Sequence, residues 1–87
     1  MMIAAGTVVI SCAGHDCGRA MLVVRIDGEF IFVADGKERK LDKPKKKNQK
    51  HVRATNRVII PDGLTDRKLR RTLRELFGQD SALQESE

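Results

Sequence analysis

The heptapeptide Ala13-Gly14-His15-Asp16-Cys17-Gly18-Arg19 separates two runs of mostly apolar residues, 7–12 and 21–26. Short apolar runs on either side of a polar, glycine-containing stretch predict two β-strands joined by a loop. We expect these strands at residues 7–13 and 20–26. Two glycines four residues apart allow the loop to adopt positive φ angles, or a ligand to approach its backbone closely.

Two Asp-Gly pairs extend the β pattern. Asp27-Gly28 predicts a two-residue type I′ hairpin into a strand at 29–34, and Asp35-Gly36 predicts a second tight hairpin into a charged strand at 37–41. After Pro44 we expect an exposed loop, because residues 45–50 are too charged to pack. Residues 51–55 and 57–60 should complete the sheet as one interrupted strand or two.

The C-terminal part predicts a helix over residues 66–77, with Thr65 as N-cap and Gly78 just past the end. Its apolar stripe, expected to lie on the sheet, consists of Leu69, Leu73, Leu76 and Phe77. Residues 79–87 are acidic and polar and are expected to be a disordered tail.

Several short strands with tight turns in 87 residues predict a mainly β fold, a small closed or half-closed barrel with a C-terminal helix. We expect the barrel at residues 1–62, the basic amphipathic helix at 63–78 and the tail at 79–87. A chain this short buries a modest core and has little room for an enclosed active site.

The net charge of +5 is concentrated in two segments. Residues 37–53 carry nine Lys/Arg and two Asp/Glu, and residues 65–75 carry five and two. Cations along an extended segment can displace condensed counterions from a nucleic-acid backbone. The alternative is a solvated surface that only keeps the protein soluble. For the helix, the sequence favours this alternative and RNA binding equally.

The candidate RNA contacts follow from this distribution. In the basic segment they are Lys37, Arg39, Lys40, Lys43, Lys45, Lys46, Lys47, Lys50, His51 and Arg53. In the glycine loop they are Gly14, His15, Gly18 and Arg19. A possible secondary basic face on the helix comprises Arg67, Lys68, Arg70, Arg71 and Arg74.

The aromatic residues favour recognition of the RNA backbone. The chain has no Trp or Tyr and three Phe; Phe30 and Phe32 alternate along a predicted strand, Phe77 lies on the helix stripe, and all three are expected in the core. Bases of single strands usually stack on exposed aromatic side chains. We therefore expect recognition of phosphates and shape in folded RNA.

Metal binding and catalysis are not expected. Cys12, His15 and Cys17 lack the paired ligand spacing of structural zinc sites, and Cys12 should alternate into the core. A reducing cytoplasm, the default in the absence of a signal peptide or membrane-spanning run, disfavours a disulfide. With no paired carboxylates and no Walker pattern, the sequence predicts no enzyme, no cofactor and no small-molecule substrate.

Three segments together resemble the small bacterial KOW-domain RNA-binding proteins, which are similar to a group of archaeal and eukaryotic large-subunit ribosomal proteins. They are Gly6-x-Val8-Val9-Ile10-Ser11-x-Ala13-Gly14-x-Asp16-x-Gly18-Arg19, Val33-Ala34-Asp35-Gly36 and Leu41-Asp42-Lys43-Pro44-Lys45-Lys46-Lys47-Asn48, with Lys50-His51 after them. The resemblance covers about residues 6–60. It implies an SH3-like barrel of about five strands, ribosomal or other structured RNA as ligand, ribosomal proteins as possible neighbours and a role in translation. Cys17 stands where such motifs often carry Lys, and Ala20 where many carry Gly.

The resulting hypothesis is a non-catalytic RNA-binding protein that binds ribosomal or other structured RNA through backbone phosphates. One alternative is a transcription-associated KOW module that contacts nucleic acid or RNA polymerase. Another is a protein-interaction adaptor whose basic segment binds an acidic partner.

Overall fold

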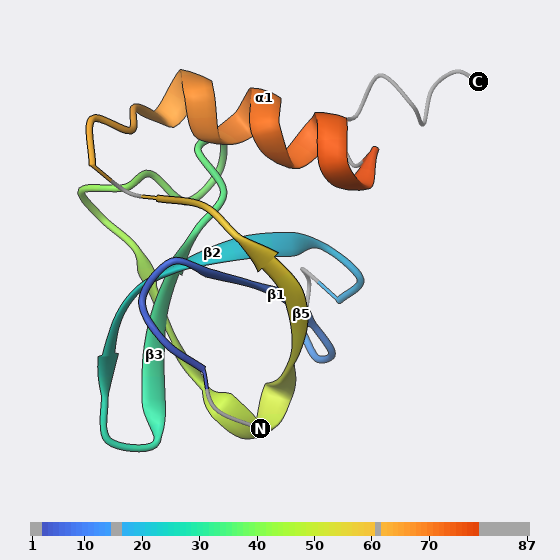
Figure 1. Ribbon diagram of the computed structural model, residues 1–87. Helices are drawn as coiled ribbons and strands as arrows, with labels where there is room; N and C mark the ends of the chain where they lie inside the picture. Colours follow the sequence, from blue (N-terminus) through green and yellow to red (C-terminus); the bar gives the residue numbers. More distant parts are fainter. Residues whose placement is uncertain (1–2, 15–16, 61, 79–87) are drawn as a thin grey trace.

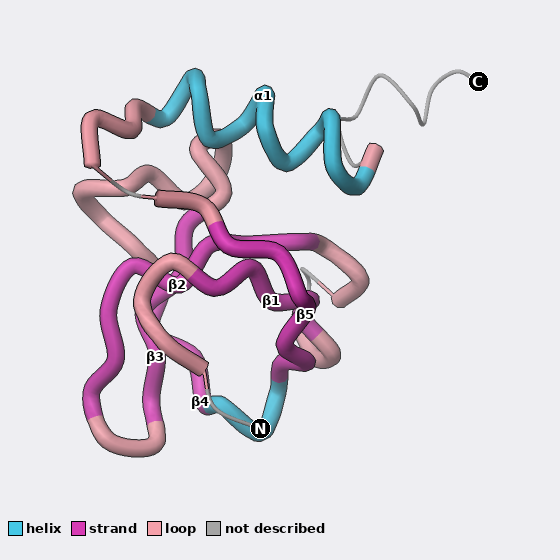
Figure 2. The backbone as a smooth tube through the Cα atoms, viewed as in Figure 1, coloured by secondary structure: helices cyan, strands magenta, loops and turns pink. Residues whose placement is uncertain are grey.

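The computed structural model describes residues 3–14, 17–60 and 62–78. These residues form one five-stranded antiparallel sheet in the order β4-β3-β2-β1-β5, followed by the helix α1 (Asp66–Phe77) (Figures 1 and 2). The strands are β1 (Thr7–Ser11), β2 (Ala20–Asp27), β3 (Phe30–Ala34), β4 (Lys45–Asn48) and β5 (Val52–Val58). The prediction of a mainly β fold with one C-terminal helix is confirmed.

The sheet is strongly curled but does not close into a barrel. Among the described residues, its edge strands β4 and β5 do not pair with each other; the 3-10 turn η1 (Gln49–His51) connects them (Figure 2). Two contacts tie this turn and β4 to the end of β1. The Cys12 N–H donates to the His51 carbonyl at 2.7 Å, and the Lys47 Nζ donates to the Ala13 carbonyl at 3.2 Å.

The central strands are buried on both faces, which explains their nearly continuous apolar runs. Neighbouring residues Val8 and Val9 are both fully buried, on opposite sides of β1. The first core lies under α1 and contains Val8, Ala20, Leu22, Ala34, Ile59, Leu69 and Leu73. The second core lies on the other face and contains Val9, Met21, Val23, Ile31 and Val33.

The helix has the bounds that the sequence predicts. The Thr65 hydroxyl accepts the Lys68 N–H at 3.1 Å, and Gly78 ends the helix in the left-handed region, at φ 62°. Leu69 and Leu73 are fully buried against the sheet, each contributing about 1.5–3 kcal/mol by leaving water. Leu76 is 38% exposed, so the buried stripe is narrower than predicted.

The β2–β3 hairpin forms as expected, but its turn is not type I′. Asp27 pairs with Phe30, so the two central residues are Gly28 and Glu29. Only Gly28 has a positive φ, at 63°. This sign pattern fits a type II′ turn, in which glycine occupies the first central position.

Two predictions for the basic segment are wrong. Residues 37–41 do not form a strand, because the Asp35 and Gly36 N–H groups both donate to the Arg39 carbonyl, at 2.9 and 3.0 Å, and close a tight loop. Residues 45–50 are not an exposed loop, because they form β4 and most of η1. Strand pairing uses backbone groups, so a lysine run can add an edge strand if its side chains reach water or a partner.

Candidate nucleic-acid interface

The basic segment occupies three consecutive places: the loop from β3 to β4, the edge strand β4, and η1 with the start of β5. Its exposed basic side chains come from all three places; they are Arg39, Lys40, Lys43, Lys46, Lys50, His51 and Arg53. Lys37 and Lys45 are half-buried. The predicted cations thus follow the open edge of the sheet and its flanking turns.

The consecutive lysines of β4 lie on alternate faces of the sheet. Lys46 pairs across the strands with Phe32, whereas Lys47 pairs with buried Ile31 and points to the opposite face. Lys47 is 8% exposed, and its ammonium group donates to the Ala13 carbonyl. We therefore remove Lys47 from the candidate RNA contacts, because its charge serves the connection between β4 and the end of β1.

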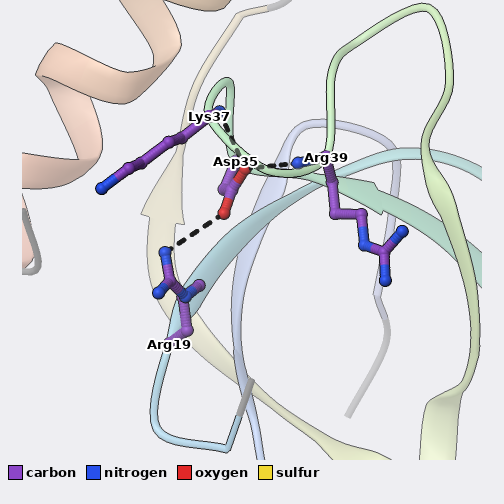
Figure 3. Close-up of polar contacts among 4 residues, drawn as sticks. All are labelled: Arg19, Asp35, Lys37 and Arg39. Carbon is purple, nitrogen blue, oxygen red and sulfur yellow. Dashed lines mark hydrogen bonds and ion pairs between the residues drawn. The ribbon is translucent and has the colours of Figure 1, made fainter. Parts of the chain in front are cut away.

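A buried carboxylate organises the loop from β3 to β4 (Figure 3). The Asp35 Oδ1 accepts the N–H groups of Lys37 and Arg39, each at 2.9 Å. The side chains of these two residues extend away from the carboxylate, as Figure 3 shows. Asp35 thus fixes the backbone from which two candidate contacts project, a role that we did not assign from the sequence. The Asp-Gly pair was the available signal, since Asp often hydrogen-bonds the backbone N–H two residues on.

Arg19 lies against the same carboxylate. Its guanidinium nitrogen is 3.4 Å from the Asp35 Oδ2, and its side chain is 31% exposed. The ion pair joins the end of the glycine loop to the loop from β3 to β4. Arg19 is therefore a positioning residue here, with part of its surface still facing water.

The two glycines of the glycine loop have the positive φ angles that the sequence predicts. Gly14 and Gly18 have φ angles of 83° and 88°, and the Gly18 N–H donates to the Ser11 carbonyl at 2.8 Å. A Cβ atom built on Gly18 meets nothing within 4 Å, so the dihedral angle, not crowding, favours glycine there. The candidate contact His15 lies outside the described residues.

The two cysteines are exposed free thiols. The expectation that Cys12 points into the core is wrong, because β1 ends at Ser11 and Cys12 lies just beyond it. Within residues 3–14, 17–60 and 62–78, no three His, Cys, Asp or Glu side chains gather where they could hold a metal ion.

The outer side of α1 carries an arginine stripe. Arg67, Arg70, Arg71 and Arg74, at helical spacings i, i+3, i+4 and i+7, line one shallow hollow of about 310 Å³. Lys68 is exposed but does not line this hollow. Like charges three and four residues apart disfavour a helix by about 0.2–0.5 kcal/mol per pair. The stripe therefore does not stabilise the helix, and it presents a concentrated positive charge.

Two of the three phenylalanines are not core residues, contrary to our prediction. Phe30 and Phe32 are half-buried and pack against neither core, whereas Phe77 packs against the core under α1. The Arg25 guanidinium lies 4.0 Å from the centroid of the Phe32 ring, and the Lys46 Nζ lies 4.4 Å from that of Phe30.

No helix in the described part of the chain has the length and apolar character needed to cross a membrane. No protein-family model matches this sequence, and a search of curated proteins finds no match.

Proposed function

We propose that this chain is a non-catalytic RNA-binding protein that binds ribosomal or other structured RNA through backbone phosphates, in a translation-related role. The observation that carries the proposal is the state of the cations between residues 37 and 53. Six of them are exposed and form no ion pair with a described carboxylate: Arg39, Lys40, Lys43, Lys46, Lys50 and Arg53.

The organisation of the fold supports this function. The Asp35 carboxylate orders the loop that carries Arg39, and strand pairing fixes the side of the sheet on which Lys46 lies. Cations on a rigid scaffold lose less conformational entropy when they bind than cations on a disordered segment. The arginine stripe of α1 adds a second surface of the same sign.

The proposal includes the KOW resemblance. Two strands joined by a loop with two positive-φ glycines, within a small curled sheet, are compatible with an SH3-like KOW domain. On this proposal the protein acts in the cytoplasm, and its partners are ribosomal RNA and the ribosomal proteins around it.

The direct test is a titration of the purified protein against ribosomal RNA fragments at several salt concentrations. If about five phosphates are neutralised, log K falls with log salt at a slope of roughly −3.5 to −4.5. Binding that does not depend on salt, or no binding at all, contradicts the proposal.

Fractionation of a lysate on a sucrose gradient tests the setting. We expect the protein to sediment with ribosomal particles and to be released by nuclease. Co-purification with RNA polymerase instead supports the transcription alternative, and a complex that survives nuclease supports an acidic protein partner.

A further inference from the structure

The outer face of β3 continues beyond the area that α1 covers. Phe30 and Phe32 alternate with buried Ile31 and Val33, so they lie on the same face as Ala34, which packs under α1. The end of the β2–β3 hairpin extends away from the helix, toward the lower left of Figure 1. The two rings therefore continue the outer face where no helix covers it.

Each ring has a cation over it, and both cations come from neighbouring strands. Arg25 on β2 and Lys46 on β4 are the cross-strand partners of Phe32. The guanidinium of Arg25 lies over Phe32 and the ammonium of Lys46 lies over Phe30. Both cations are exposed, with long side chains that can move from a ring to a nearby anion.

The cross-strand partners of Phe30 differ from those of Phe32, because neither of them is basic. Asp27 and Asn48 are the cross-strand partners of Phe30, and the Asn48 Oδ1 accepts the Lys50 N–H at 2.8 Å. The exposed carboxylate of Asp27 repels a phosphate but can accept a hydrogen bond from an N–H group on the edge of a base, such as the N3–H of uracil. The partners of Phe32 are thus suited to a phosphate backbone, whereas the partners of Phe30 are suited to the edges of bases.

We propose that Phe30, Phe32, Arg25 and Lys46 form an aromatic face that binds an unpaired stretch of RNA, with one base stacked on each ring. This inference rests on the proposed function and specifies the RNA that one part of the surface takes. Residues two apart on a strand lie about 6.7 Å from each other. Two neighbouring bases that no longer stack on one another can each reach a ring at this spacing.

The rings distinguish this ligand from other anions. The bases of a duplex are stacked and paired, so their faces are not available to a side chain. A duplex or an acidic protein uses the cations and gains little from the two aromatic faces. An unpaired strand uses both, because its phosphates can take Arg25 and Lys46 while its bases take Phe30 and Phe32.

The test compares the full chain with the double variant Phe30→Leu/Phe32→Leu, which keeps apolar side chains and removes the ring faces. The probes are a short oligouridylate, a duplex RNA with the same number of phosphates, and polyglutamate. We expect the double variant to bind the oligouridylate at least about tenfold more weakly, because each stacked base contributes substantially. Its affinity for the duplex should change by less than about twofold, since phosphate contacts dominate there.

Phe77→Leu is the matched control, because the third phenylalanine packs against the core under α1. It should change thermal stability and leave both RNA affinities unchanged. A second measurement uses the oligouridylate with 2-aminopurine in place of one base. Stacking on a ring should quench its fluorescence in the complex with the wild-type protein and the Phe77→Leu control, but not with the double variant.

The outcomes separate the two proposals. Salt-dependent binding of the duplex, with oligouridylate binding unaffected in the double variant, overturns the aromatic face and leaves the proposed function standing. No binding of any RNA overturns both. Polyglutamate binding that the double variant loses identifies an acidic protein as the occupant and also overturns the aromatic face.

Discussion

The carboxylate of Asp35, 2% exposed, lies 3.4 Å from the guanidinium of Arg19 and also accepts two backbone N–H groups (Figure 3). Through this one side chain, the glycine loop and the loop from β3 to β4 hold each other in place. A buried carboxylate is costly unless its oxygens are satisfied, and here both oxygens have partners. Part of the basic segment is therefore positioned by an acid.

Asp35→Ala should lower the free energy of unfolding by about 2–4 kcal/mol, because it leaves the N–H groups of Lys37 and Arg39 without their acceptor. The lost ion pair adds little, since the Arg19 side chain is 31% exposed and can be solvated. Chemical denaturation measures the loss. Glu38→Ala is the control, since this exposed acid lies in the same loop, and it should change stability by less than about 0.5 kcal/mol. Equal effects from both substitutions contradict the role assigned to Asp35.

Gly36→Ala should displace α1. A Cβ atom at Gly36, where φ is 80°, overlaps the Asp66 carbonyl oxygen and lies 3.0 Å from the Arg70 nitrogen. Gly28→Ala is a matched control, because Gly28 also has a positive φ but a Cβ atom there meets nothing within 4 Å. We expect a loss of about 1–3 kcal/mol at Gly28, from backbone strain alone, and a clearly larger loss at Gly36. Similar losses in denaturation experiments contradict close packing of α1 on this loop.

Lys46→Ala and Lys47→Ala should have opposite consequences although the residues are neighbours. Loss of Lys47 removes one of the two donors to the Ala13 carbonyl, the other being the Ser11 hydroxyl, and also removes the buried aliphatic part of the lysine side chain. We therefore expect the free energy of unfolding to fall by about 1–3 kcal/mol. Loss of Lys46 should reduce the salt slope of RNA binding by about 0.7–0.9, with a stability change of about 0.5 kcal/mol. Denaturation and salt titration of both variants decide the matter; a smaller salt slope for Lys47→Ala at unchanged stability would count against its structural role.

The arginine stripe should contribute to RNA affinity without stabilising α1. For Arg70→Gln/Arg71→Gln we expect the salt slope to become shallower by roughly 1.5, as two phosphate contacts are lost. Helix stability should be unchanged or slightly higher, because like-charge pairs are removed. Lys68→Gln, outside the hollow, is the control and should have the smaller effect on binding. An unchanged salt slope in the double variant would show that the arginine stripe does not contact RNA.

Some elements could be predicted from the sequence because their signals are local. The helix begins after Thr65 and ends at Gly78 because capping depends on neighbours within one turn, and the positive φ angles of Gly14 and Gly18 follow from the absence of a side chain. The concentration of cations in residues 37–53 is likewise a property of the sequence alone.

The side of the sheet on which each lysine lies, and the pairing of the strands, could not be predicted from the sequence. The loop at Asp35 takes up the residues expected to form a strand, so pairing with β3 begins at Lys45. That register sends Lys46 to the outer face, where its ammonium group lies over Phe30, and sends Lys47 inward. The pairing of β2 with β3 places Arg25 over Phe32, and we had expected both phenylalanines in the core. Register and burial depend on contacts between residues far apart in the sequence, and alternation along one strand cannot tell which of its faces will be covered.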